Sequence, residues 1–143
     1  MSNPNVIGDT GTTYEGCVDA MYYFAVAVAA GDTVMEDVGT TTTSNGNTIP
    51  AGGAAKKSTA TDDLASILGG ALYAVRAGTF GMVRRAGVQT GVACGTVTAG
   101  DPLMSSTSAA GRVAIASASS VNIVANALTS ASSNTCTVRW KTL

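Results

Sequence analysis

The chain has 143 residues, with nine acidic and eight basic side chains and a formal net charge of −1 at pH 7. This balance excludes the clustered positive field that nucleic-acid-binding proteins usually carry, so we expect no nucleic-acid partner. The sequence contains no histidine, which removes Ser-His and Cys-His nucleophilic machinery and the commonest zinc ligand. We therefore expect a protein that is not an enzyme and that has no cofactor or metal site.

The low charge content points to a surface that is covered by other molecules. Charged residues make up 12% of the chain, about half of the ~25% that is usual for a soluble domain. Such a surface offers little electrostatic resistance to contact with its own copies or with partners. A plain soluble domain with a Ser/Thr-rich surface remains the alternative.

The N-terminal segment differs in composition from the rest. Residues 1–13 are polar and lack core-type periodicity, so we expect an extended arm before a single β-rich domain of residues 14–143. A frayed terminus would have the same composition. The arm lacks the basic and apolar regions of a signal peptide. The apolar run 21–30 is shorter than the roughly twenty residues that cross a bilayer, and we expect no membrane partner.

One short motif in the arm resembles a catalytic one. Residues 9–12 read Asp-Thr-Gly-Thr, as in aspartic proteases, whose half-size forms dimerise so that two carboxyl groups share a proton. A hydrophobic-Gly segment follows at 67–70. However, only Val6 and Ile7 supply apolar residues ahead of Asp9, too few for the strand that holds a strained carboxylate turn. A solvated turn is the favoured interpretation.

Cys17, Cys94 and Cys136 are odd in number and far apart in sequence. We expect three reduced thiols in a protein made in a cytoplasm. One disulfide with one free thiol is the weaker alternative.

The first half of the domain alternates strands with polar turns. The strongest strand signal covers 14–29 and continues at 34–38, while the Thr/Ser/Asn tract 40–47 predicts a projecting hairpin loop with an Asn-Gly turn.

Residues 61–69 predict the one short helix, with a Thr cap, an acidic pair in the first turn and a terminal Gly. Leu64, Ile67 and Leu68 would then share one face. A strand that begins near Ile67 competes with the end of this helix.

From residue 70 onward the pattern is β throughout. The expected strands lie near 70–76, 80–85, 87–97, 102–105, 111–117, 121–128 and 135–141. Short strands at this spacing predict a mainly β fold, a sandwich or a barrel. Trp140 is expected in the core, or else as an interface anchor.

A motif that occurs twice suggests a duplicated β architecture. Residues 30–34 and 99–103 both read Ala-Gly-Asp-X-apolar, and each predicts a turn that leads into a strand. A partial echo links 67–72 with 123–128. The spacing differs between the copies, so this is not a strict repeat.

The order of these segments resembles the tailed-bacteriophage capsid decoration, or head cement, proteins. The matching series is Ala-Gly-Asp-Thr-Val (30–34), Lys-Lys-Ser-Thr-Ala (56–60), Gly-Ala-Leu (70–72), Ala-Gly-Thr-Phe-Gly-Met-Val (77–83), Gly-Val (87–88), Ala-Gly-Asp-Pro-Leu (99–103), Gly-Arg-Val (111–113), Asn-Ala-Leu (126–128) and Val-Arg (138–139). Asn126 departs from the family, which usually has Gly there. The tract 40–47 is an insertion.

The resemblance implies a structural virion protein without enzymatic activity, built as a compact β-barrel or β-tulip-like domain. It implies a trimer on the outer surface of an icosahedral head, made in the host cytoplasm, that cements neighbouring major capsid protein subunits and stabilises the expanded capsid. The expected capsid contacts are in the arm, at Asn3, Pro4, Asn5, Val6 and Ile7. The alternative is a head-fibre or tail module that recognises a host surface or glycan, which would need an exposed aromatic platform.

Overall fold

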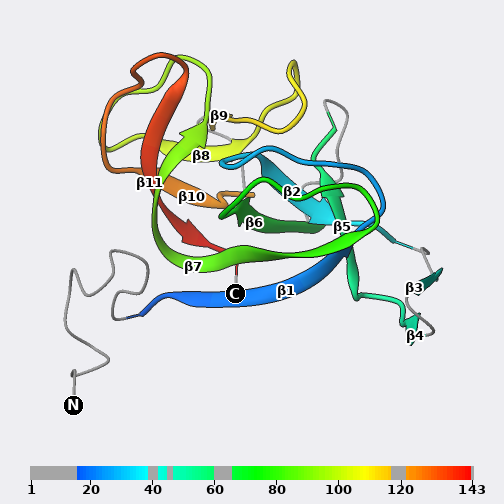
Figure 1. Cartoon of the computed structure of the whole chain (residues 1–143). Helices are drawn as coiled ribbons and strands as arrows, with labels where there is room; N and C mark the ends of the chain where they lie inside the picture. Colours follow the sequence, from blue (N-terminus) through cyan, green and yellow to red (C-terminus); the bar gives the residue numbers. More distant parts are fainter. Residues whose placement is uncertain (1–15, 39–41, 45–46, 60–65, 117–121, 143) are drawn as a thin grey trace.

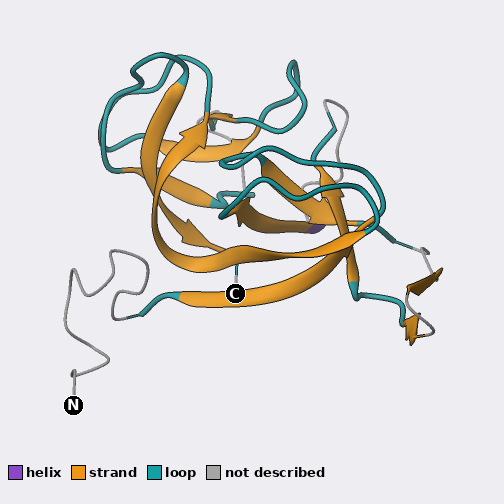
Figure 2. Ribbon diagram, in the orientation of Figure 1, coloured by secondary structure: helices purple, strands orange, loops and turns teal. Residues whose placement is uncertain are grey.

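The computed structural model describes residues 16–38, 42–44, 47–59, 66–116 and 122–142, and the expected arm lies outside these ranges. The strands are β1 (Val18–Phe24), β2 (Thr33–Glu36), β3 (Thr42–Ser44), β4 (Asn47–Ile49), β5 (Ala54–Lys57), β6 (Ile67–Ala71), β7 (Thr79–Ala93), β8 (Pro102–Ser105), β9 (Val113–Ile115), β10 (Ala125–Ala127) and β11 (Thr135–Lys141) (Figure 1). Figure 2 shows strands and loops over almost the whole described chain, which confirms the mainly β prediction.

Nine strands form one sheet in the order β1-β5-β2-β6-β7-β11-β10-β8-β9. Strand β1 also pairs with β7, which closes β1, β5, β2, β6 and the N-terminal part of β7 into a barrel. We call this the first barrel. The β1–β5 pairing is parallel and the other pairings around this barrel are antiparallel. Each of these five strands has a neighbour on both sides along part of its length, with β1 meeting β5 at Tyr23 and Phe24, and this closure confirms the predicted barrel.

The second half of the sheet repeats this pattern. Strand β8 lies between β9 and β10, and β10 pairs with β11, just as β2 lies between β5 and β6 and β6 pairs with β7. The pair Gln89–Val138 in β7 and β11 corresponds to Ala20–Val83 in β1 and β7. We call β11, β10, β8, β9 and the C-terminal part of β7 the second barrel.

A parallel bridge between Cys94 and Val113 joins the two ends of the second barrel. It stands where the parallel β1–β5 pairing closes the first barrel. The long strand β7 contributes to both barrels and connects them (Figure 1).

The two Ala-Gly-Asp motifs form the same turn. Asp32 Oδ2 accepts a hydrogen bond from the Ala29 N–H at 2.9 Å, and Asp101 Oδ2 accepts one from the Thr98 N–H at 2.8 Å. The glycine before each aspartate has a positive φ, +86° in the first motif and +96° in the second, a region that glycine enters without a Cβ penalty. The predicted turns are confirmed.

Each turn is also hydrogen-bonded to a strand of its own barrel, and the two strands correspond to each other. The Gly31 N–H donates to the Ala71 carbonyl and the Gly100 N–H donates to the Ala127 carbonyl, both at 2.8 Å. Ala71 and Ala127 occupy matching places in the echoed segments 67–72 and 123–128. The duplication that the sequence suggests is therefore present in the backbone.

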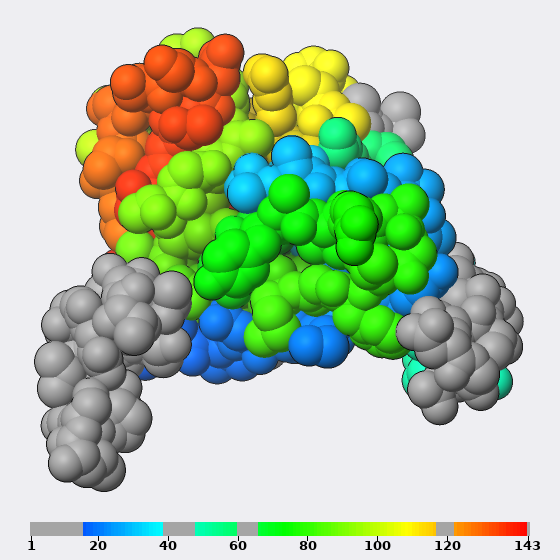
Figure 3. Space-filling view, viewed as in Figure 1, coloured from blue at the N-terminus to red at the C-terminus, as the bar shows by residue number. Residues whose placement is uncertain are grey.

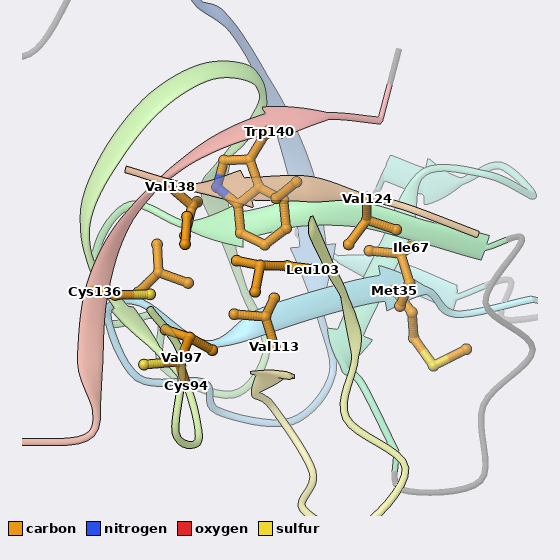
Figure 4. Packing of buried hydrophobic residues seen from close by; sticks show 13 residues of the cluster. Met35, Ile67, Cys94, Val97, Leu103, Val113, Val124, Cys136, Val138 and Trp140 are labelled. Atoms are coloured by element: carbon orange, nitrogen blue, oxygen red, sulfur yellow. The ribbon is translucent and has the colours of Figure 1, made fainter. Parts of the chain in front are cut away.

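Strands β2 and β6 separate two hydrophobic cores. Val34 and Leu68 belong to the core of the first barrel, whereas their neighbours Met35 and Ile67 belong to the core of the second. Successive side chains of a strand point to opposite faces, so two strands can supply both cores. We call β2 and β6 the shared wall. The second core, seen in Figure 4, consists of Met35, Ile67, Val92, Cys94, Val97, Leu103, Val113, Val124, Ala125, Ala127, Cys136, Val138 and Trp140.

The predicted helix is wrong over its last residues, which lie in β6 as the competing strand prediction has it. Residues 61–65 fall outside the described ranges. Ile67 and Leu68 enter different cores rather than sharing a helical face. Gly69 lies against β7 so closely that a Cβ there would overlap the Arg84 carbonyl. Strand pairing with β2 and β7 overrides the local capping signals.

The predicted strands 80–85 and 87–97 form one strand, β7, so Gly87 does not end a strand as expected. Strands β8 and β11 have the expected bounds of 102–105 and 135–141. The strand expected over 14–29 is shorter, because β1 ends at Phe24. Trp140 lies in the core, 2% exposed.

The predicted hairpin forms as β3 and β4, with Ser44 opposite Asn47, in a two-stranded sheet of its own. Ile49 at its base is buried with Tyr23 and Ala54. Figure 1 shows this hairpin beside the barrels rather than in them. Within the described ranges, no helix is long and apolar enough to cross a membrane.

Candidate interaction surface

The described residues offer a surface rather than a catalytic centre. They contain no group of three or more His, Cys, Asp or Glu side chains that could hold a metal ion. Asp9 and the proposed capsid contacts at 3–7 lie outside the described ranges. The exposed outer face of the first barrel carries the strongest interaction signal.

That face is built on the antiparallel pair of β1 and β7. Met21 lies opposite Met82, and Tyr23 lies opposite Phe80. Alternation along each strand places these side chains outside the barrel, because the intervening Tyr22 and Val83 belong to its core. The Tyr23 and Phe80 rings meet edge to face, with centroids 5.6 Å apart. We call Met21, Phe80 and Met82 the β1–β7 stripe.

The stripe is open to solvent. Met21 is 63% exposed and Phe80 is 46% exposed. Five of the eight large hydrophobic side chains exposed among the described residues lie on β1, on the start of β7 or in the loops that adjoin them: Val18, Met21, Val26, Tyr73 and Phe80. Figure 3 shows β1 in blue and the neighbouring green segments together along the lower surface. A contiguous exposed apolar surface is a feature of interaction sites, and Met21 and Phe80 on the paired strands β1 and β7 are the candidates for one here.

An ion pair borders the stripe. Arg84 Nε donates to Asp19 Oδ1 at 2.8 Å and Arg84 Nη2 donates to Asp19 Oδ2 at 3.0 Å, while Nη1 donates to the Val88 carbonyl at 2.7 Å. The Arg84 side chain is 4% exposed. Its hydrogen bond with Asp19 raises the pKa of Arg84 above its ordinary value. The two charges at this border therefore neutralise each other.

The corresponding face of the second barrel has a different chemistry. Counted from the corresponding pairs Gln89–Val138 and Ala20–Val83, Thr90 and Thr137 take the places of Met21 and Met82, at a point where the β7–β11 register shifts. Thr90 is exposed, and so are the basic side chains of Arg139 and Lys141 on β11. The same backbone thus folds with polar side chains, which means that the fold does not require an apolar stripe.

A second apolar part of the first barrel's outside is already covered. Met35 and Ile67 project from the shared wall into the core of the second barrel and are 8% and 5% exposed. Outward apolar side chains on one side of this barrel therefore have a partner within the chain. In the stripe, Phe80 meets the ring of Tyr23, but Met21 remains 63% exposed.

This surface is not among the sites predicted from the sequence. The signal was available in β1, where Met21 and Tyr23 fall between core residues in a strand of alternating pattern. Reading it required the register of β1 on β7, since Phe80 and Met82 come from a segment almost sixty residues later.

The three cysteines have free thiols in the structure, Cys17 partly exposed and the other two buried. Cys94 and Cys136 lie at the same end of the second core (Figure 4). Burial, with a smaller contribution from a hydrogen bond with Cys94, raises the pKa of Cys136 to about 12. The Cys136 thiol is therefore protonated and poorly reactive at neutral pH.

No protein-family model matches the chain, and no curated protein matches it. In fold the chain is similar to the N base of the head fiber gp8.5 of bacteriophage phi29. The TM-score is 0.54 and the sequence identity is 14%, and the match covers 88% of this chain and 95% of that chain. At this identity the likeness shows a shared fold.

Proposed function

We propose that this protein is a structural component of a bacteriophage head that binds the outer surface of the icosahedral capsid. The observation that carries the proposal is the fold shared with the base of a phage head fibre over most of both chains. The ordered motifs that resemble head cement proteins support the same conclusion independently. We further propose that binding cements neighbouring major capsid protein subunits and that the protein acts without enzymatic activity.

Simple energetics explain how such a protein would stabilise a shell. Each contact contributes about 25 cal/mol per Å² of buried apolar area, less the cost of ordering the partners. A homotrimer would engage several subunits at once, which raises the effective concentration of each further contact. We propose that Asn3, Pro4, Asn5, Val6 and Ile7 supply contacts to the major capsid protein by pairing along an exposed strand edge.

A head-fibre base is the second candidate, and the fold of the phi29 protein favours it. In that role the barrels would seat a longer assembly on the head without bridging capsid subunits. Direct glycan recognition has less support. Tyr22, Tyr23, Phe24 and Trp140 are buried, and the exposed aromatic rings among the described residues are Tyr73 and Phe80, too few for a stacking platform.

The test uses expanded heads that lack the protein. Purified protein is added to these heads, occupancy is measured by cosedimentation and electron microscopy, and rupture is followed by the release of packaged DNA on heating. Saturable binding with a higher rupture temperature supports cementing. Saturable binding with an unchanged rupture temperature supports the fibre base. Absence of binding to expanded heads overturns both.

The matched variant lacks residues 2–13. We expect it to keep the melting temperature of the full chain and to lose occupancy on heads. Equal losses in melting temperature and occupancy would show that these residues belong to the folded domain.

A further inference from the structure

We propose that the β1–β7 stripe is the contact between copies of this chain, placed at the symmetry axis of the homo-oligomer. Met21 of one copy would then meet Met21 of the next. This inference rests on the self-association in the proposed function and names the surface that performs it.

Exposure of the apolar stripe to water costs free energy, and the barrel fold does not require apolar residues at these positions. Met21 is 63% exposed, whereas the corresponding position in the second barrel is Thr90. A polar residue is therefore compatible with this place in the barrel. Burial of the stripe would gain about 25 cal/mol per Å² of apolar area, which supplies a reason for the methionines.

The charges on and around the stripe favour a second copy of this chain as the molecule that covers it. A residue that lies on a two-fold or three-fold axis meets its own copies. An unpaired charge at that place would therefore meet charges of the same sign. The stripe itself carries no ionisable group. At its border, Asp19 and Arg84 are joined by two hydrogen bonds within one copy. Such a surface is complementary to itself.

The corresponding face of the second barrel fails the same criterion. Arg139 and Lys141 are both exposed on β11, and a symmetry axis through that face would bring like charges together. The stripe is therefore the face of the first barrel suited to symmetric contact.

Another side of the first barrel shows how outward apolar side chains of this barrel can be covered. The second barrel already covers Met35 and Ile67 on the shared wall, so the outside of the first barrel is a surface that buries apolar side chains under a neighbouring barrel. A second copy provides such a neighbour for the stripe.

The experiment uses full-length Met21→Glu and Met21→Lys, each measured by light scattering after size-exclusion chromatography. Like charges would meet at the axis in each variant, so we expect both to be monomeric at concentrations where the natural protein is oligomeric. An equal mixture of the two should regain the oligomer in full at a two-fold axis, because opposite charges then meet. At a three-fold axis it should regain it in part, because two of the three charges have the same sign. Thr90→Glu, on the corresponding face of the second barrel, should stay oligomeric.

Circular dichroism checks that every variant melts as the natural protein does, and Met82→Glu replaces Met21→Glu if that variant unfolds. Recovery of the oligomer in the mixture supports the proposal. Two monomeric variants that do not recover together overturn the placement at the axis. If both variants remain oligomeric, the stripe is not the contact between copies. This holds even if the variants no longer bind heads. A monomeric natural protein that still binds heads overturns the self-association but leaves the proposed function standing.

Discussion

The two barrels share a backbone plan but differ in what surrounds them. In each, an Ala-Gly-Asp turn leads into a strand that lies between two antiparallel neighbours, and the register of the pairings corresponds. The first barrel has the exposed β1–β7 stripe, while the corresponding face of the second carries threonines and basic residues. The second core has Trp140 and two thiols, whereas Tyr22 and Phe24 are the aromatic residues of the first.

The comparison distinguishes residues that the barrel fold requires from residues that it does not require. Features that occur in both barrels, such as the aspartate turns, are needed to form a barrel. A feature that occurs in one, such as the stripe, is not required by the backbone plan that the barrels share. Substitutions at corresponding positions therefore measure the two contributions separately.

The largest effect is expected at Trp140, which is 2% exposed and whose Nε1 donates to Gln89 Oε1 at 2.8 Å. Gln89 Nε2 in turn donates to the Ala71 carbonyl in the shared wall. Trp140→Ala should lower the free energy of unfolding by about 3–5 kcal/mol. Because β7 and the shared wall belong to both barrels, urea denaturation should still show one transition.

Hydrogen exchange of β1 and β11 gives the readout for each barrel. Trp140→Phe is the control, since it keeps most of the volume and loses the hydrogen bond, and it should cost less. Unfolding of the second barrel while β1 stays protected would show that the barrels are independent units.

Arg84 and Arg139 occupy corresponding positions with opposite environments. Arg84 is 4% exposed and holds Asp19 with two hydrogen bonds, whereas Arg139 is exposed. Arg84→Ala should cost about 3 kcal/mol, because it leaves the carboxylate without its partner. Arg139→Ala should change stability by no more than about 0.5 kcal/mol. Chemical denaturation of both variants measures the contrast, and equal costs would contradict it.

The aspartate turns should differ by less. Asp32 and Asp101 accept the same backbone hydrogen bond, but Asp32 is 9% exposed and also lies 3.5 Å from Lys57 Nζ. We expect Asp32→Ala to cost about 2 kcal/mol and Asp101→Ala about 1 kcal/mol. The Asp→Asn variants keep an acceptor oxygen and should recover part of each loss in thermal melts. Identical costs would show that burial and Lys57 add nothing.

Much of the fold was predictable because its signals are local. The bounds of β8 and β11 follow from alternation, and the repeated turns follow from Gly and Asp. The end of the predicted helix failed because Ile67 and Leu68 serve two different cores, a long-range condition that local capping signals do not contain. The stripe was missed for a related reason, since Met21 and Phe80 become neighbours through the pairing of β1 with β7.

The two cores should also differ in the pH dependence of their stability. Burial raises the pKa of Cys136 to about 12, against about 8.5 for an unperturbed thiol in the unfolded chain. The folded protein holds this proton more tightly, so the contribution is fully present below the unfolded pKa and is lost as the pH rises toward 12. Stability should therefore begin to fall above about pH 8.5.

In Cys136→Ala that part of the fall should disappear, although the variant is less stable at neutral pH because it leaves a small cavity. Cys17→Ala is the matched control, because Cys17 lies outside the second core and is partly exposed. Urea denaturation at intervals from pH 7 to pH 10 measures the slope for all three proteins, and a slope that Cys136→Ala leaves unchanged would assign the alkaline loss to other groups.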